Sequence, residues 1–365
     1  MFEGSISVYS DDLVFQKTNN ALPKLSIIIP VFNNSKNEIY RCLNSINNQV
    51  YENIETLIID DGSSLQCRDM LDELPLTFRN CYVKHKEHSG VSAARNFGVS
   101  IASGDFITFI DSDDSFADHF FLDLKQLFSV YNLEKFDVIY GYVKRVYELP
   151  KSNVDISPVQ LSNIRLVSLL DKENLVKEFI ENHIDTFRDH NGYLGCVSVA
   201  RVVKSSIMKK NKFNEALSLN EDNIWNLDLL KKSSNSIIID HCWYYYIYNK
   251  KSATHKFSKE VVQSYEKYLD YLWKNYIIKP SYAVRFLKLT IHLSLNLKGK
   301  SYKSNLSPKL RIRNLFKNDP WKKEFKWAYI FHLSIKEQII FVLLKLKLID
   351  FIYCIKIRFF KSNNW

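Results

Sequence analysis

The segment Leu25-Ser26-Ile27-Ile28-Ile29-Pro30-Val31 decides the fold of this 365-residue chain. It is almost continuously apolar, which is typical of a strand buried on both faces of a parallel sheet. Apolar side chains at helical spacing follow, with Asn37 as the expected helix cap. A second apolar segment, residues 55–59, completes a strand–helix–strand unit, which makes parallel strands with a right-handed crossover. The sequence therefore predicts an α/β fold with a mostly parallel central sheet flanked by helices.

Polar loops follow both apolar segments, at the ends where open parallel sheets bind ligands. Phe32 and Asn33 follow the first segment, and Asp61-Gly62-Ser63 follows the second. A carboxylate at such a place can accept a hydrogen bond from a ribose hydroxyl or a base N–H, while glycine lets a ligand approach the backbone. A plain tight turn is the structural alternative for these residues.

The acidic segment Asp111-Ser112-Asp113-Asp114 follows a third expected strand, residues 105–110. Three carboxylates within four positions repel one another and raise each other's pKa unless a cation lies between them. A divalent cation that carries a phosphate would satisfy them. The alternative is an acidic loop that caps the next helix through Asp113 or Ser115.

A fourth segment, residues 88–98, begins with small residues and then has an arginine at a helix start. Helix N-termini and arginine both suit phosphate oxygens. Gly90 and Arg95 are the residues of this segment that would contact such a group.

Together the four segments resemble the nucleotide-sugar half of inverting family 2 glycosyltransferases of the GT-A fold, over residues 24 to about 128. The family's Ile-Pro-x-Tyr/Phe-Asn, Asp-Asp-Gly-Ser, Gly-x-x-x-Ala-Arg-Asn-x-Gly and Asp-x-Asp motifs match, in this order, residues 29–33, 60–63, 90–98 and 111–113. The resemblance implies a GT-A domain that binds a nucleotide sugar, most simply a UDP-sugar.

The resemblance also implies roles for single residues. Asp113, with Asp111 at the ribose side, would bind Mn²⁺ or Mg²⁺ across the diphosphate, and Arg95 would neutralise part of its charge. The backbone near residues 30–32 and the carboxylate of Asp61 would hold the base and the ribose. The nucleotide-sugar-binding set implied in this way is Pro30, Val31, Phe32, Asn33, Asp61, Gly62, Ser63, Gly90, Arg95, Asp111 and Ser112.

An inverting transferase also needs a base that takes the proton of the acceptor hydroxyl. In the family this is the aspartate of a Glu-Asp pair that opens a helix, and Glu221-Asp222 before a helical pattern fits that description. We therefore expect Asp222 to be the general base and Glu221 to bind the acceptor or orient the loop. The alternative is that both acids only favour the N-terminus of a helix.

The chain departs from the family after the aromatic segment 241–248. The usual arginine is missing there, and Asn249-Lys250-Lys251-Ser252 stands in its place. One of these lysines or His255 would then close over the diphosphate. His255 is also a candidate metal ligand, since imidazole suits Mn²⁺ and Zn²⁺.

The net charge of +10 belongs to the C-terminal part of the chain. Residues 285–365 hold 18 Lys and Arg against 4 Asp and Glu, interleaved with aromatic side chains. Basic, aromatic helices bind anionic membrane surfaces, so residues 321–361 are predicted to lie on one. A helical subdomain with a solvated basic face, or a dimerisation helix, is the alternative. No nucleic-acid-binding module accompanies the charge, so nucleic acid is not expected as a partner.

Length and spacing suggest four regions. They are an N-terminal extension (1–23), a nucleotide-sugar-binding half (24–130), an acceptor-binding half (131–260) and a helical, basic and apolar C-terminal region (261–365). The six cysteines have no Cys-x-x-Cys spacing, and no apolar stretch is long enough to span a membrane. We expect a cytoplasmic protein, peripheral on the inner face of the cell membrane.

The sequence thus predicts an inverting, metal-dependent transferase that moves a hexosyl or N-acetylhexosaminyl group. Its acceptor would be a glycan or lipid-linked glycan in bacterial capsule, lipooligosaccharide or exopolysaccharide synthesis. A teichoic-acid or glycoprotein glycosyltransferase is one alternative. A catalytically inactive glycan-binding or scaffold protein is another.

Overall fold

A computed structural model gives the fold in two compact units. The described residues of Met1–Val176, Asp185–Glu215 and Trp225–Asn249 form the first unit, and those of Lys177–Ile184, Ala216–Ile224 and Lys250–Trp365 form the second. The structure describes residues 22–132, 135–150, 157–167, 176, 197–217, 220–248, 267–268, 271, 274–275, 330–331 and 335–346.

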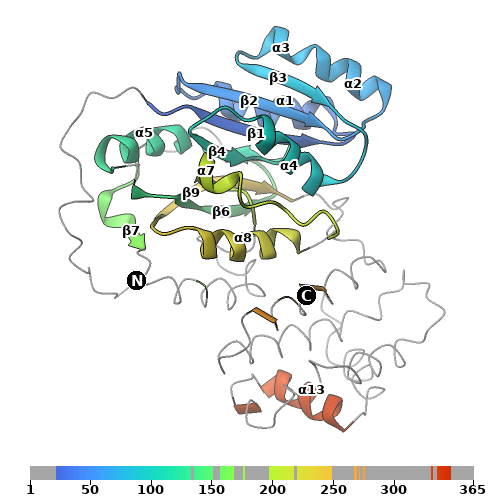
Figure 1. The fold of residues 1–365 in the computed structure, drawn as a ribbon, viewed down its shortest axis with the longest axis vertical. Helices are drawn as coiled ribbons and strands as arrows, with labels where there is room; N and C mark the ends of the chain where they lie inside the picture. The colour runs from blue at the N-terminus through green and yellow to red at the C-terminus, as the bar shows by residue number, and fades with distance from the viewer. Residues whose placement is uncertain are drawn as a thin grey trace. The chain divides into compact units, whose positions relative to one another are not determined.

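The first half of the sheet is entirely parallel, in the order β3-β2-β1-β4 (Figure 1). Its strands are β1 Leu25–Val31, β2 Ile54–Asp60, β3 Cys81–His85 and β4 Phe106–Phe109. The helices between and after them are α1 Lys36–Asn47, α2 Leu65–Asp72, α3 Leu74–Thr77 and α4 Val91–Ile101. All seven residues of β1 are buried. The central strand predicted from the apolar segment is therefore confirmed.

Helix α1 begins one residue before the position expected of its cap. Ser35 is the N-cap, and it forms a capping box with Glu38, since each side chain bonds the other residue's backbone N–H. Asn37 lies inside the helix, so the prediction that it caps α1 was wrong. The apolar face of the helix was predicted correctly, because Ile39, Leu43 and Ile46 are buried with Cys42.

The second half of the sheet is mixed. Strand β8 is antiparallel to β4 and to β6, β6 is parallel to β9, and β9 pairs antiparallel with β5 and β7. These strands are β5 Ser115–Phe116, β6 Val138–Val146, β7 Ile164–Val167, β8 Arg201–Lys204 and β9 Ser236–Ile247. The other elements are α5 Phe120–Val130, a 3₁₀ turn at Leu161–Asn163, α7 Ser205–Met208 and α8 Glu221–Lys232.

Strand β9 is a single long strand from Ser236 to Ile247. Its register against β6 shifts between Tyr140 and Val143, which marks a bulge or irregularity near His241. Next to this shift, Trp243 packs directly on Gly141, where an added Cβ would lie 2.5 Å from the indole ring. Glycine is therefore required at 141 for Trp243 to reach its buried position.

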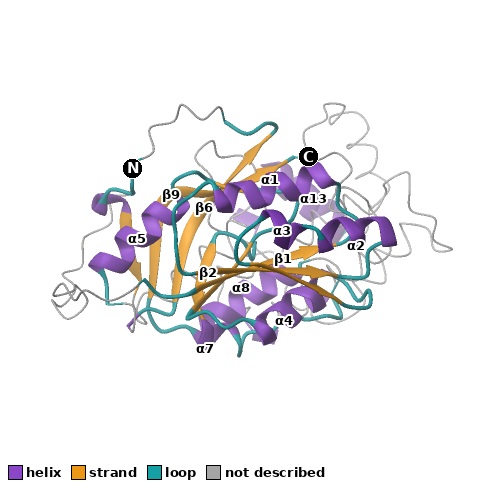
Figure 2. Ribbon diagram, turned by 90° about the horizontal axis from the view of Figure 1, so that it is seen from above, coloured by secondary structure: helices purple, strands orange, loops and turns teal. Residues whose placement is uncertain are grey.

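Helices cover both faces of the sheet (Figure 2). Helices α1 and α3 lie on one side of β1 and β2, and α4, α7 and α8 lie on the other. This layered arrangement leaves the carboxyl ends of β1, β2 and β4 at one edge, where the candidate site is built. It confirms the predicted α/β class.

In the second unit, helix α13 spans Ile335–Lys345. Phe341 is buried, whereas Phe331, Ile335, Ile339 and Leu346 are exposed. Among the described residues, no helix is long and apolar enough to cross a membrane. Most of the N-terminal extension and of the predicted C-terminal helical region lies outside the described residues.

Candidate functional site

The acidic loop follows β4 directly, as the sequence predicted. Asp111 keeps a partly exposed side chain, Asp113 is half-buried and Asp114 is only 1% exposed. Burial, and then the charge of Asp111, raise the pKa of Asp113 to about 6. Burial, and then the charges of Asp113 and Asp111, raise the pKa of Asp114 well above its usual range. The loop therefore concentrates negative charge that a cation would relieve.

Two arginines contact the acidic loop. Arg95 of α4 places Nη2 2.7 Å from Oδ1 of Asp111, and the arginine side chain is 4% exposed. Arg41 of α1 donates a hydrogen bond from Nη2 to the backbone oxygen of Asp113. The sequence predicted that Arg95 neutralises part of the charge of a diphosphate. In the structure Arg95 forms an ion pair with the carboxylate of Asp111, a residue of the same predicted site.

Tyr244 of β9 fixes the acidic loop through two hydrogen bonds of its hydroxyl group. Its hydroxyl accepts a hydrogen bond from the backbone N–H of Asp111 at 3.1 Å and donates one to Oδ2 of Asp114 at 2.7 Å. The backbone N–H of Ile247 donates to the other oxygen of Asp114, at 2.8 Å. Asp114 therefore fixes the loop to β9. The N-cap of α5 is His119, so neither Asp113 nor Ser115 caps that helix.

The Asp-Asp-Gly-Ser turn follows β2 and is organised by its own carboxylates. Asp60 is fully buried and accepts hydrogen bonds from the backbone of Ser63 and from Nδ1 of His85. Asp61 is 3% exposed and accepts hydrogen bonds from Nζ of Lys86 and from the backbone N–H groups of Ser89 and Gly90.

These contacts decide the charge state of Asp61. Burial alone would raise its pKa, but the hydrogen bonds from Lys86, Ser89 and Gly90 outweigh burial and hold the pKa below its usual value. Asp61 therefore ties the turn after β2 to the start of α4. The sequence predicted a carboxylate that faces a ribose or a base, and these protein contacts were not foreseen.

Gly62 is required by the close approach of two loops. Its φ is +78°, and an added Cβ would lie 2.7 Å from the backbone nitrogen of His88. On the other side, Oγ of Ser63 accepts a hydrogen bond from the backbone N–H of Asn33, and Oδ1 of Asn33 accepts one from Ser64. The turns after β1 and β2 are thus joined, as the pairing of the two strands requires.

An aromatic pair lies beside this turn. The rings of Phe32 and His88 stack with centroids 4.2 Å apart, and Phe32 is 48% exposed. Nδ1 of His88 lies 2.9 Å from the backbone oxygen of Asp61. An exposed, oriented aromatic face of this kind can stack on the flat base of a nucleotide.

A second contact network supports Arg95. Its guanidinium lies over the ring of Phe213, 5.3 Å from the centroid, and Phe213 stacks on Trp225 of α8 with centroids 4.9 Å apart. Asn96 donates a hydrogen bond to the backbone oxygen of Phe213 and accepts one from its N–H. Trp225 also packs edge-on against Phe109, at the end of β4.

Glu221 and Asp222 lie in the first turn of α8, as predicted. They belong to the second unit, whereas the acidic loop and α4 belong to the first. His255, Lys250 and Lys251 lie outside the described residues. The remaining members of the predicted binding set lie in the loops described above or at the ends of β1 and β4: Pro30, Val31 and Ser112.

The donor atoms of the acidic loop fit a hard divalent cation. They are carboxylate oxygens, which Mn²⁺ and Mg²⁺ prefer, and two of the three carboxyl groups have raised pKa values that a cation would reverse. The arrangement can hold a cation beside an anionic ligand and an aromatic face.

Sequence reasoning missed four residues of this site: Arg41, Lys86, His88 and Tyr244. Arg41 and Tyr244 are distant in sequence from the loop that they hold, and nothing in their local pattern points to it. Lys86 and His88 could have been found, because His88 is the first residue of the segment 88–98 and Lys86 lies two residues before it.

Comparison with known proteins agrees with this geometry. Residues 26–149 match the profile of the family described as Glycosyl transferase family 2. The putative glycosyltransferase EpsH of Bacillus subtilis is 40% identical over 92 residues, which are 25% of this chain and 26% of the relative. The poly(ribitol-phosphate) beta-glucosyltransferase of Bacillus spizizenii is 26% identical over 241 residues, which are 64% of this chain and 33% of the relative. The chain thus spans about a quarter to a third of the length of these relatives.

Solved structures match over more of the chain. The crystal structure of S. aureus TarS 1–349 in complex with UDP covers 93% of both chains, with a TM-score of 0.60 and 17% sequence identity. A longer S. aureus TarS structure covers 90% of this chain and 53% of its own, with a TM-score of 0.59 and 18% identity. At this level of identity the likeness concerns the fold, which is the GT-A fold expected from the motifs. The chain therefore carries a glycosyl transferase family 2 domain of the GT-A fold.

Proposed function

We propose that this protein is an inverting glycosyltransferase that moves a sugar from a UDP-sugar to a glycan or a lipid-linked glycan. The observation that carries the proposal is the acidic loop at the end of β4. There Asp111 pairs with Arg95 and its backbone is held by Tyr244, while Arg41 bonds the backbone oxygen of Asp113. The bound UDP of the TarS structure of the same fold supports the choice of nucleotide.

The donor would lie across the carboxyl ends of β1, β2 and β4. The exposed ring of Phe32, held by His88, would stack on the base. Asp61 would act mainly by fixing the loop that precedes α4, since its oxygens already accept three hydrogen bonds. A Mn²⁺ or Mg²⁺ ion held by Asp111 and Asp113 would supply positive charge to the departing diphosphate.

We assign the general base to Asp222. It would accept the proton of the acceptor hydroxyl as the oxygen forms its bond to the anomeric carbon, while the bond to the diphosphate breaks. Glu221 would orient the acceptor. The support is local to α8: both acids lie in its first turn. His255 would be a further metal ligand, and Lys250 or Lys251 would close over the diphosphate.

The acceptor class has two candidates. A bacterial capsule, lipooligosaccharide or exopolysaccharide glycan is the first. A polyol-phosphate polymer is the second, because the match to the poly(ribitol-phosphate) enzyme extends over 64% of this chain. The surplus of Lys and Arg after residue 284 suits a polyanionic polymer as well as an anionic membrane.

We further propose that the protein is cytoplasmic and lies on the inner membrane surface through residues 321–361. Exposed Ile335 and Ile339 lie one helical turn apart on α13, in this basic region. Vesicle flotation tests this. The double substitution Ile335→Asp and Ile339→Asp should abolish binding to anionic vesicles. The matched control pair, Leu65→Asp and Leu76→Asp on α2 and α3, should leave it intact; equal binding by both variants would refute the membrane proposal.

The enzymatic proposal is tested by binding and slow hydrolysis of a panel of nucleotide sugars. One UDP-sugar should bind and be hydrolysed only with Mn²⁺ or Mg²⁺. Asp222→Asn should keep donor binding and lose transfer, whereas a merely structural helix cap would leave transfer unchanged. Failure to bind any member of the panel would favour the alternative of a catalytically inactive, glycan-binding protein.

A further inference from the structure

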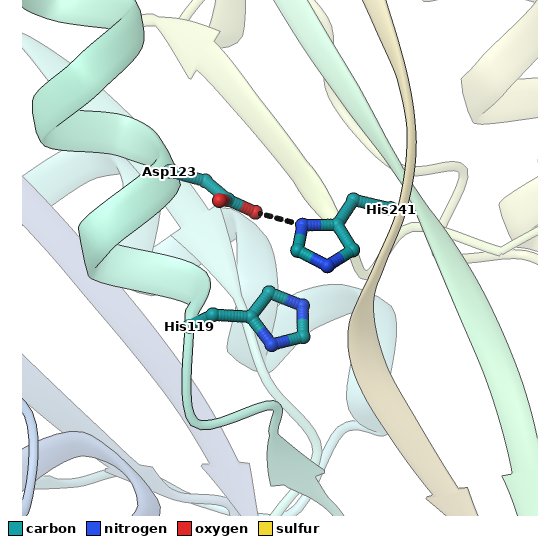
Figure 3. Close-up of side chains that lie close together, drawn as sticks. All are labelled: His119, Asp123 and His241. Carbon is teal, nitrogen blue, oxygen red and sulfur yellow. Dashed lines mark hydrogen bonds and ion pairs between the residues drawn. The ribbon is translucent and has the colours of Figure 1, made fainter. Parts of the chain in front are cut away.

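A second group of potential metal ligands lies outside the acidic loop. His119 precedes α5, Asp123 lies in its first turn, and His241 lies on β9 (Figure 3). Asp123 is fully buried, His119 is 8% exposed, and the side chain of His241 is 30% exposed. One ligand atom from each residue lies within 4.8 Å of those of the other two. Nothing in the proposed transfer reaction uses these residues.

Asp123 is held rigidly in this cluster. Its Oδ1 accepts a hydrogen bond from the backbone N–H of Val159 at 2.7 Å. Its Oδ2 lies 2.8 Å from both Nδ1 of His241 and Nε1 of Trp243. A carboxylate on one ring nitrogen fixes the tautomer and direction of a histidine, and metal-binding histidines use this arrangement regularly.

Both histidines present a ring nitrogen for a ligand. His241 has Nδ1 on Asp123, which leaves its Nε2 for a cation. Nε2 of His119 is buried and has no hydrogen-bond partner among the described residues. A buried polar atom without a partner needs an explanation.

We propose that His119 and His241, with Asp123 bonded to Nδ1 of His241, form a second divalent-cation site for a zinc-class ion. Two imidazoles with a carboxylate favour Zn²⁺ or Co²⁺, whereas the all-oxygen set of Asp111 and Asp113 favours Mn²⁺ or Mg²⁺. The two rings stack with centroids 3.7 Å apart. One ring must therefore turn so that both lone pairs reach one ion. His119 is that ring, because its Nε2 has no hydrogen bond to break among the described residues, whereas His241 is held by Asp123.

The ion would act as a structural clamp between α5 and β9. Tyr244 follows His241 by three residues on β9, and it holds the backbone of Asp111 and the carboxylate of Asp114. The cation would thus stiffen the strand that supports the acidic loop, without contact with the donor.

Cobalt titration of the full chain tests the site. The double variant Asp111→Asn and Asp113→Asn serves as background, because it removes the other expected metal site. Visible absorption of Co²⁺ should report one bound ion per chain, displaced by Zn²⁺, and Zn²⁺ should raise the melting temperature more than Mg²⁺ does. In the same background, His241→Gln should abolish the absorption, and Asp123→Asn should weaken binding by about 10- to 100-fold.

The matched control is Asp240→Asn, which removes an exposed carboxylate next to His241 on the same strand. It should bind Co²⁺ like the background protein. Far-UV circular dichroism checks that each variant is folded, and His119→Gln replaces His241→Gln if the latter is not. Absence of the Co²⁺ spectrum in the background protein, or an unchanged spectrum in both histidine variants, would overturn the proposal.

Discussion

Tyr244→Phe removes one hydroxyl from beneath the acidic loop and leaves the ring in place. The hydroxyl makes two hydrogen bonds, to the backbone N–H of Asp111 and to Oδ2 of Asp114. Tyr244 is fully buried and Asp114 is 1% exposed, so water cannot replace the lost bonds. At about 1 kcal/mol for each bond, and more where a buried acceptor loses its donor, the free energy of unfolding should fall by roughly 2–4 kcal/mol.

The same substitution should weaken Mn²⁺ binding about tenfold or more, because a residue behind the ligands would no longer fix them. Urea unfolding and calorimetric Mn²⁺ titration measure the two effects. Tyr245→Phe is the matched control, since the Tyr245 hydroxyl has no hydrogen-bond partner among the described residues. If Tyr244→Phe unfolds at the urea concentration of Tyr245→Phe and binds Mn²⁺ as the wild type does, the supporting role of Tyr244 is wrong.

Two further predictions concern the turn after β2. Gly62→Ala should destabilise the fold by more than the roughly 1–2 kcal/mol that a left-handed residue costs, because the new Cβ also meets the His88 backbone. A loss of no more than about 2 kcal/mol in urea unfolding would contradict the contact. For His85, burial alone would lower the pKa, but Asp60 and Asp72 outweigh it and raise the pKa above 6.5. The stability that the raised pKa of His85 contributes is fully present below pH 6.5 and is lost as the pH rises through the folded-state pKa. His85→Gln should therefore flatten the pH dependence of urea unfolding above pH 6.5. An unchanged pH profile would contradict the role of His85.

The sequence was most informative where one segment determines its own structure. The apolar segment 25–31 became β1, and the acids at 111–114 lie after β4, because continuous burial and strand ends are local properties. Glu221 and Asp222 open α8 for the same reason. Spacing alone did not choose the cap of α1, because the Ser35–Glu38 pair decides it.

The sequence was least informative where the fold joins distant segments. His119 and His241 are 122 positions apart in the chain, and only the pairing of β5 with β9 brings their neighbourhoods together. His119 and Asp123, four residues apart in the sequence, were the one local signal of that cluster. Tyr244 looked like one member of an aromatic strand until the structure placed its hydroxyl between two residues of the acidic loop.

The most direct test of the central claim is a calorimetric titration of UDP into the protein, once with Mn²⁺ and once with EDTA. We expect binding with Mn²⁺, little or none with EDTA, and loss of the Mn²⁺-dependent binding in Asp113→Asn. Equal binding of UDP in Mn²⁺ and in EDTA would contradict the account, because the acidic loop would then not hold the cation that joins it to the nucleotide.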